Sequence, residues 1–213
     1  MQNNYNINQR KMAYKYFKYP SRYAVLTDEP IACEICKKKQ ICLDATAFYS
    51  KDEIEAICEN CLKSGRLPEI EACSNDADVE ELFDQLIHLH PNKKRETLLQ
   101  EAKAKTDELE FRTPPLVSWQ DWKFPALDGD YAQFVCFGSK HEYNKYAPDG
   151  DGKAFFEKWL LDDLREFTNF ENLWRAVPEN RIRTVSQSND FSLLTYLFKS
   201  LHSEQYVIVW DLM

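Results

Sequence analysis

Apolar residues recur at helical spacing through one region of the chain, residues 75–110. In the first half of this region the apolar positions lie three or four residues apart: Val79, Leu82, Phe83, Leu86 and Ile87. This spacing predicts a helix that is capped by Asn75 or Asp76 and ended by Pro91. A second helix is predicted over residues 93–110, with apolar residues on one side: Leu98, Leu99, Ala102 and Leu109. The two helices form a predicted hairpin whose outer face is solvated.

Aromatic and β-branched runs predict strands near both ends of the chain. YAQFVCFG (131–138) is short and aromatic, which is typical of a buried strand, and YVIVW (206–210) is β-branched and aromatic. Residues 1–31 are polar with interspersed apolar side chains and are expected to be extended. Those apolar residues are Phe17, Tyr19, Tyr23, Val25 and Leu26.

Two more helices are predicted in the C-terminal half. Residues 154–174 predict one long amphipathic helix, and PDGDGK (148–153) predicts a glycine-containing turn before it. The apolar residues of this helix are Phe155, Phe156, Trp159, Leu160, Leu164 and Phe167. FSLLTYLFKSL (191–201) predicts another helix.

These elements predict an α+β fold. We expect a small zinc-ribbon-like or knuckle-like module over residues 13–73, packed on a larger mixed α/β domain over residues 111–213. Residues 74–110 form the helical hairpin insertion, and the parts are expected to make one unit. With 213 residues, of which 44% are hydrophobic, the chain is long enough to bury a core of its own.

The charge of the chain is uneven, and this bears on its partners. The formal net charge is −8, but residues 1–27 hold five basic residues and no acid, which leaves −13 on the remainder. The five are Arg10, Lys11, Lys15, Lys18 and Arg22. An acidic body attracts basic partners and repels nucleic acid, although ordinary solubility accounts for the same charge. The sequence shows neither a membrane-spanning run nor a secretory signal, so we expect a cytoplasmic protein.

The cysteines carry the clearest chemical pattern. Six of the seven lie within residues 32–73, and two Cys-x-x-Cys pairs are separated by 21 residues. The pairs are Cys33 with Cys36 and Cys58 with Cys61. Two such pairs supply four sulfurs for a tetrahedral zinc ion, and a closed shell of four thiolates makes that ion structural.

Other roles for the four cysteines remain open at this point. Disulfides are disfavoured because seven is an odd number and a reducing compartment keeps thiols reduced. A thioredoxin-like redox site needs one pair after a strand and at the start of a helix, within a βαβ unit. Four independent thiols are the remaining alternative. Cys136 lies in an apolar run and is expected in the core, whereas Cys42 and Cys73 are assigned no role.

Other candidate sites are weaker. His88 and His90 lie at a helix end, where a cation near the helix C-terminus explains them without a metal. YKYFKYPSRY (14–23) interleaves basic and aromatic residues, as single-strand nucleic-acid grooves do, but an edge strand explains it equally well. No Gly-x-Ser-x-Gly or His-Glu-x-x-His motif occurs, and no pair of acids is singled out as catalytic.

Several segments, taken in order, resemble the CbrC family, a poorly characterised bacterial group linked by name to colicin tolerance. The segments are FKYP (17–20), CEIC (33–36), AFYSKDEIEAICENCLKSG (47–65), RTPPLVSWQDWKF (112–124), DYAQFVCFG (130–138) and YLFKSLHSEQYVIVWD (196–211). The resemblance covers most of the chain except the first dozen residues and the charged helices at about 75–108.

The resemblance implies that the four paired cysteines form the metal shell. It also implies a second signature of unknown role, made of Arg112, Thr113, Pro114, Trp119 and Gln120. Members of the family commonly carry a third Cys-x-x-Cys pair near the end, where this chain has Ser200, Leu201, His202 and Ser203. Serines cannot replace thiolate ligands, so the N-terminal cysteine site would have to be self-sufficient.

The expected function is that of a non-enzymatic toxin immunity or tolerance protein that carries a structural zinc. It would bind and neutralise a bacteriocin-like toxin, for example a basic nuclease domain, because an acidic surface steers and orients a basic partner. One alternative is a regulatory zinc-ribbon protein that binds nucleic acid through its basic N-terminus, although nucleic acid is the disfavoured partner. Another is an unrecognised enzyme that uses residues 112–122. The oligomeric state, the partner and the metal stay open.

Overall fold

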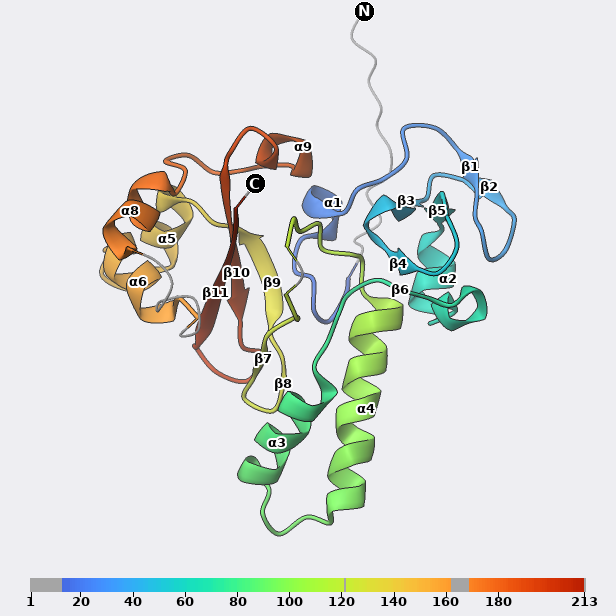
Figure 1. Ribbon diagram of the computed structural model, residues 1–213, viewed down its shortest axis with the longest axis horizontal. Helices are drawn as coiled ribbons and strands as arrows, with labels where there is room; N and C mark the ends of the chain where they lie inside the picture. Colours follow the sequence, from blue (N-terminus) through green and yellow to red (C-terminus); the bar gives the residue numbers. More distant parts are fainter. Residues whose placement is uncertain (1–12, 121, 162–168, 213) are drawn as a thin grey trace, which may run out of the picture.

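The computed structural model describes residues 13–120, 122–161 and 169–212. It combines helices with small antiparallel sheets, so the α+β prediction is confirmed. Figure 1 shows a group of short strands at one end, a projecting helical hairpin in the middle and a three-stranded sheet with its helices at the other end. Among the described residues, no helix combines the length and apolar character needed to cross a membrane.

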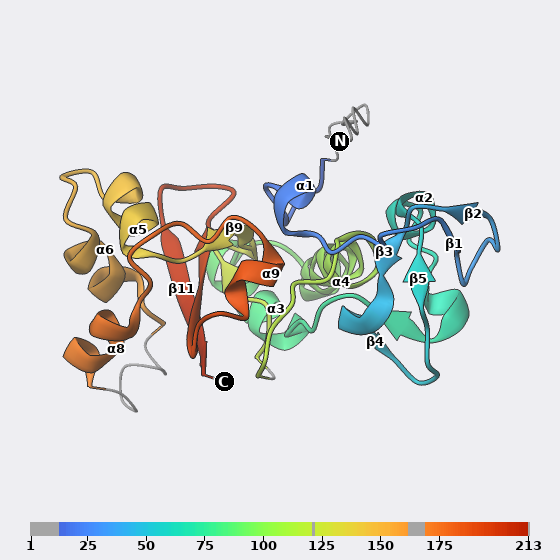
Figure 2. The ribbon, with the colours of Figure 1, turned by 90° about the horizontal axis from the view of Figure 1, so that it is seen from above.

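The three-stranded sheet is built from β9 (Gln133–Phe137), β10 (Leu193–Lys199) and β11 (Tyr206–Leu212), in the order β11-β10-β9. All pairings are antiparallel. The helix predicted over residues 191–201 is wrong, because these residues form β10. The first six positions of β10 are buried, so both of its faces are covered. Figure 2 shows why: helices lie on one side of the sheet and the hairpin on the other. An apolar run buried on both faces suits a central strand better than a surface helix.

Helices α5 (Lys140–Tyr146), α6 (Gly152–Trp159) and α8 (Phe170–Ala176) cover one face of the sheet. The single helix predicted over residues 154–174 is therefore wrong. Helix α6 ends at Trp159, and Leu160 leaves the helix to form a parallel bridge with Ile208 of β11. Leu164 and Phe167 lie outside the described residues.

The turn predicted before α6 is present. Gly150 has a φ of +79°, and the Asp151 carboxylate accepts hydrogen bonds from the N–H groups of Lys153 and Ala154. A glycine takes the left-handed conformation without a steric penalty, and the aspartate then caps the helix.

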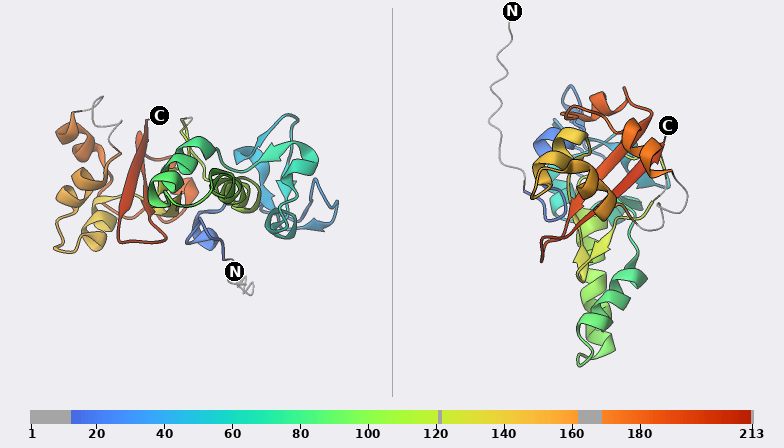
Figure 3. Two further views of the ribbon diagram at one scale, coloured as in Figure 1. Left: turned by 90° about the horizontal axis from the view of Figure 1, so that it is seen from below. Right: turned by 90° about the vertical axis from the view of Figure 1, so that its left-hand side faces the viewer.

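The helical hairpin is made of α3 (Val79–Leu89) and α4 (Arg95–Arg112), and Figure 3 shows it projecting from the rest of the chain. The predicted caps are wrong: Asp78 caps α3 and accepts from the N–H groups of Glu80 and Glu81. Leu99 was expected on the buried side but is 37% exposed. The hairpin residues that are buried as expected are Leu82, Leu86, Leu98, Ala102 and Leu109.

The N-terminal part forms its own small cluster of buried residues, separate from the larger core. Its strands are two residues long and pair as β1 with β2, β3 with β5 and β4 with β6. Their bounds are β1 (Ile31–Ala32), β2 (Lys39–Gln40), β3 (Leu43–Asp44), β4 (Tyr49–Ser50), β5 (Ala56–Ile57) and β6 (Ala72–Cys73). The helical elements here are α2 (Glu59–Lys63), η1 (Ala45–Ala47) and η2 (Leu67–Ile70).

The segment that leads into this cluster is only partly extended. Phe17 bridges Phe134 and Leu26 bridges Leu43, but Pro20–Tyr23 forms the short helix α1, so the prediction of extended structure is wrong for these four residues. Residues 1–12, which the prediction also covered, lie outside the described residues. The proline sets the backbone angle of a first helical turn. The described residues also form the hairpin of β7 (Ala126–Leu127) with β8 (Asp130–Tyr131), and helix α9 (Val185–Ser188).

Glu110, near the C-terminal end of α4, makes the fold sensitive to pH. Burial and, to a smaller extent, the nearby acids Asp76 and Asp107 together raise the pKa of its carboxyl group to about 7. An acid whose folded pKa lies above its unfolded value opposes folding once it ionises, so its stabilisation is lost between about pH 4.5 and 7.

We therefore expect Glu110→Gln to raise the melting temperature at pH 8 by about 2–4 °C. This corresponds to about 1 kcal/mol once solvent screening of a partly exposed group is allowed for. The difference should vanish near pH 4, where both states of the parent are protonated. Thermal denaturation across this pH range checks the effect, with Glu96→Gln as an exposed control on the same helix. A gain that is the same at every pH would contradict the assignment.

Candidate metal centre

The first cysteine pair lies in a tight turn between β1 and β2. The N–H of Cys33 donates to the carbonyl oxygen of Lys38 at 3.1 Å, and the N–H of Lys37 donates back to the carbonyl of Cys33 at 2.8 Å. Lys37 has a φ of +57°, which reverses the chain directly after Cys36. This is the knuckle geometry that the sequence predicts for a Cys-x-x-Cys pair.

The second pair has a different local structure. Cys58 follows β5 and is the N-cap of α2, where its sulfur accepts a hydrogen bond from the N–H of Cys61 at 3.5 Å. The second pair therefore opens a helix instead of forming another turn between strands. A strand followed by a helix is also the local context of a redox pair, so context alone does not separate the two roles.

The convergence of the four sulfurs distinguishes a metal site from a redox pair. The Sγ atoms of the four paired cysteines all lie within 4.8 Å of one another. Cys36 Sγ and Cys58 Sγ are 3.7 Å apart, whereas metal–sulfur bonds of about 2.3 Å give a tetrahedron whose edge is about 3.8 Å. All seven cysteines are free, so the cluster is not a pair of disulfides. These four residues can hold one metal ion.

The surroundings favour thiolates at some positions and oppose them at others. Burial disfavours ionisation of Cys33, but hydrogen bonds from backbone N–H groups outweigh it and lower the pKa of this thiol. One of them is the N–H of Cys58, at 3.3 Å from Cys33 Sγ. Burial raises the pKa of Cys58 and of Cys61. A bound cation would remove this penalty because it favours all four ionised sulfurs.

Cationic side chains flank the cluster on its open side. A hollow of about 330 Å³ next to Cys36 and Cys61 is lined in part by Lys38 and Arg66. The Arg66 guanidinium donates to Cys61 Sγ at 3.6 Å. Four thiolates and a divalent cation carry two net negative charges, which these basic groups can offset. A shell of four thiolates around one ion would leave no coordination position for a substrate.

The other three cysteines lie outside this group. Cys42 is buried nearby, but its sulfur faces the carbonyl oxygen of Ile31 at 3.8 Å. Cys136 is buried in β9, as predicted. Cys73 lies in β6 and is half-buried.

The second signature does not converge on one site. Arg112 donates to the carbonyl oxygen of Lys63 at the end of α2, at 2.8 Å. The Thr113 hydroxyl caps the carbonyl of Glu108, and the Pro114 carbonyl accepts from the buried side-chain amide of Asn75. These contacts join the cysteine module to the hairpin.

The rest of the signature is joined to the last strand. Asp211 is fully buried, and its carboxylate accepts from the N–H of Trp119 at 2.8 Å, from the indole of Trp122 at 2.8 Å and from the hydroxyl of Tyr196 at 2.6 Å. The side-chain amide of Gln120 reaches the carbonyl of Leu212 at 3.5 Å. Residues 112–122 therefore form a strap, at its described positions, that joins the cysteine module, the hairpin and the sheet.

Two serines occupy the place where the resemblance implies a third cysteine pair. The hydroxyls of Ser200 and Ser203 both donate to the Asp128 carboxylate, at 2.6 and 2.5 Å. His202 lies 3.3 Å from the buried carboxylate of Asp130. These contacts close the β10–β11 turn onto the β7–β8 hairpin. His88, in the last turn of α3, and His90, at its C-cap, occupy the helix end as predicted.

A cavity of about 670 Å³ lies beside α6, and no sequence pattern predicted it. Its aromatic walls come from Tyr146 at the end of α5, from Phe155 and Trp159 of α6, and from Tyr206, which follows Trp159 by almost 50 residues. In the sequence these residues look like ordinary core positions, and only the packing of the helices on the sheet brings them together.

We expect Asp211→Ala to lower the free energy of unfolding by about 3 kcal/mol, because the buried Tyr196 hydroxyl and the partly buried N–H groups of Trp119 and Trp122 lose this acceptor. Chemical denaturation measures this loss. Asp190→Ala, at an exposed position, is the control and should change stability by no more than about 0.5 kcal/mol. Equal effects of the two substitutions would show that the strap is not anchored through Asp211.

Comparison with known proteins gives a family but no described relative. The model of the uncharacterised protein family UPF0167 matches residues 12–212. Searches of curated proteins and of solved structures each found no match. Because the match spans nearly the whole chain, the protein belongs to the uncharacterised protein family UPF0167.

Proposed function

We propose that the four paired cysteines hold one structural zinc ion and that the protein acts by binding another protein rather than by catalysis. The observation that carries this proposal is the closed group of four sulfurs, all within 4.8 Å of one another. A four-thiolate shell supports a structural ion, and zinc is the commonest structural ion with such ligands. The zinc would hold the module in shape.

The proposed partner is a basic protein. Residues other than 1–27 carry a net charge of −13, and the exposed side of α3 presents Glu80, Glu81 and Asp84 on the projecting hairpin. A charged, projecting surface speeds encounter with an oppositely charged protein and orients it. The CbrC resemblance favours a bacteriocin-like toxin as the partner, for example a nuclease domain. Binding would neutralise it by occlusion.

A second candidate is nucleic-acid binding through the basic N-terminus. Lys18 and Arg22 each lie 5.4 Å from the ring centroid of Tyr19, which is 37% exposed. The remainder of this segment is engaged elsewhere: Lys15 pairs with the buried Asp130 at 2.9 Å. Arg10 and Lys11 lie outside the described residues. Salt-sensitive retention of a single-stranded oligonucleotide that is lost in a Lys18→Ala/Arg22→Ala variant would favour this alternative.

The enzyme alternative has the least support. A hollow of about 350 Å³ is lined by Trp119 and Gln120 but not by Arg112. The described signature residues therefore do not line one common pocket.

We expect Cys58→Ser to abolish binding of about one metal ion per chain and to lower the melting temperature by roughly 10 °C, because ligand loss removes folding free energy from the module. Metal analysis by mass spectrometry and thermal denaturation measure the two effects. Cys42→Ser is the matched control: it is buried close by but is not among the four. It should keep its metal. Retained metal in Cys58→Ser would refute the assignment of Cys58 as a ligand.

The binding proposal predicts that the immobilised protein captures a basic protein from a lysate of its own organism or of toxin-producing competitors. Mass spectrometry identifies the captured protein. Capture should fall steeply between 0.1 and 0.5 M salt, since screening weakens surface electrostatics. It should also fall at least about tenfold in a Glu80→Lys/Asp84→Lys variant. Salt-independent capture, or capture only of acidic proteins, would contradict the proposal.

A further inference from the structure

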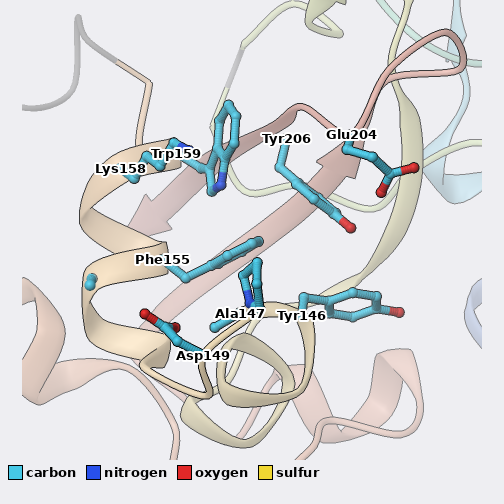
Figure 4. A pocket seen from close by; sticks show the side chains of 10 residues that line it. Tyr146, Ala147, Asp149, Phe155, Lys158, Trp159, Glu204 and Tyr206 are labelled. Carbon is cyan, nitrogen blue, oxygen red and sulfur yellow. The ribbon is translucent and has the colours of Figure 1, made fainter.

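An aromatic cavity lies on the side of the sheet opposite the cysteine module. It measures about 670 Å³ and is formed by the end of α5, the following turn, α6 and the strand β11. Figure 4 shows the rings of Tyr146, Phe155, Trp159 and Tyr206 grouped around it. We call these four residues and the space between them the aromatic pocket. A volume of this size is typical of small-molecule sites.

The rings are arranged around Tyr206. Its ring centroid lies 5.0 Å from that of Phe155, 5.9 Å from that of Trp159 and 6.0 Å from that of Tyr146. The interplanar angles range from 53° to 66°, so the rings are tilted against one another and do not stack. Where the face of such a ring borders the cavity, its negative quadrupole attracts a positive charge.

Carboxylates add to this preference. Asp149 and Glu204 also line the cavity and lie on different sides of the rings in Figure 4. Glu204 is paired with Lys199 at 2.7 Å. Asp149 accepts a hydrogen bond from the N–H of Asp151 at 3.0 Å, and no ion pair engages it among the described residues. Its charge is therefore available to a ligand.

Lysines of the chain itself show that these rings attract ammonium groups. Lys158 Nζ lies 4.4 Å from the ring centroid of Trp159, and Lys145 Nζ lies 4.6 Å from that of Tyr146. A ring has two faces, and an ammonium group covers only one. Lys158 also lines the cavity, so its charge competes with any cationic ligand.

We propose that the aromatic pocket binds an organic cation, namely an alkylated ammonium or guanidinium group that carries an apolar body. The rings form the aromatic wall of the cavity that contacts the charged group and the apolar body, and Asp149 compensates the charge at the edge. The cation comes either from a free small molecule or from a basic side chain of a protein. This inference does not rest on the proposed zinc or toxin binding, because none of the pocket residues takes part in either.

The test uses choline and its neutral carbon isostere, 3,3-dimethylbutan-1-ol, which has the same shape without the charge. Titration is followed through the indole N–H signal of Trp159 in NMR spectra of the full chain. We expect saturable choline binding and at least about tenfold weaker binding of the isostere. Equal affinities, or no binding of either compound, would overturn the proposal. N-acetyl-arginine methylamide represents a protein-borne cation, and preference for it or for choline identifies the source.

Three variants sharpen the result. Asp149→Asn, at an exposed position, should weaken choline binding severalfold without affecting folding. Lys158→Met should strengthen binding, because it removes the competing ammonium group. Trp159→Leu removes the NMR reporter, so its choline binding is measured by isothermal titration calorimetry; it should abolish binding while the metal content stays unchanged. Stronger binding in Asp149→Asn, or weaker binding in Lys158→Met, would overturn the assignment of a cation.

Discussion

Four cysteine sulfurs gathered within 4.8 Å of one another set the main physical constraint on this protein. Four thiolates at such distances repel one another, and burial adds to the cost of their charge. A divalent cation removes both penalties at once. The strands around the cluster are two residues long, and the cluster of buried residues beneath them is small. A core of this size gains little from apolar burial alone, so in our proposal the metal supplies much of the folding free energy of the module.

The strap explains how such a module stays in place. Arg112 binds the last turn of α2, directly after the second cysteine pair, and Asp211 anchors the other end of the strap to the sheet. The guanidinium also fits closely against Gly65, where an added side-chain carbon would lie 2.8 Å from it. The signature that the resemblance left without a role is therefore structural at its described positions. In our proposals, recognition lies elsewhere, on the acidic hairpin and in the aromatic pocket.

The parts that sequence predicted well are those with local causes. The Cys-x-x-Cys spacing predicted which four cysteines come together, because each pair is brought together by its own turn or helix start. The hairpin followed from its helical periodicity, and its termination near Pro91 followed from the proline. By contrast, β10 was predicted as a helix because a run that is apolar at nearly every position shows neither the helical nor the strand period. Only its packing between two layers shows that it is a strand.

Local sequence patterns did not predict the contacts between residues that are far apart in the chain. The hydrogen bond from the N–H of Trp119 to the carboxylate of Asp211 joins residues that are 92 positions apart. No sequence pattern near either residue predicts this bond. Helix α6 stops at Trp159 because Leu160 finds a partner in Ile208, almost 50 residues later in the chain. The aromatic pocket was missed for the same reason, since its rings converge only once the helices lie on the sheet. The role of a residue whose partners are distant in the sequence can be assigned only from the three-dimensional structure.

X-ray absorption spectroscopy of the purified, metal-bound protein identifies the ion and counts its sulfur ligands. We predict a zinc edge and a single shell of four sulfur atoms at about 2.3 Å. A shell that contains nitrogen or oxygen ligands, or fewer than four sulfurs, would contradict a closed four-thiolate centre. Protein that folds fully and holds no metal at all would contradict the claim that the ion stabilises the module.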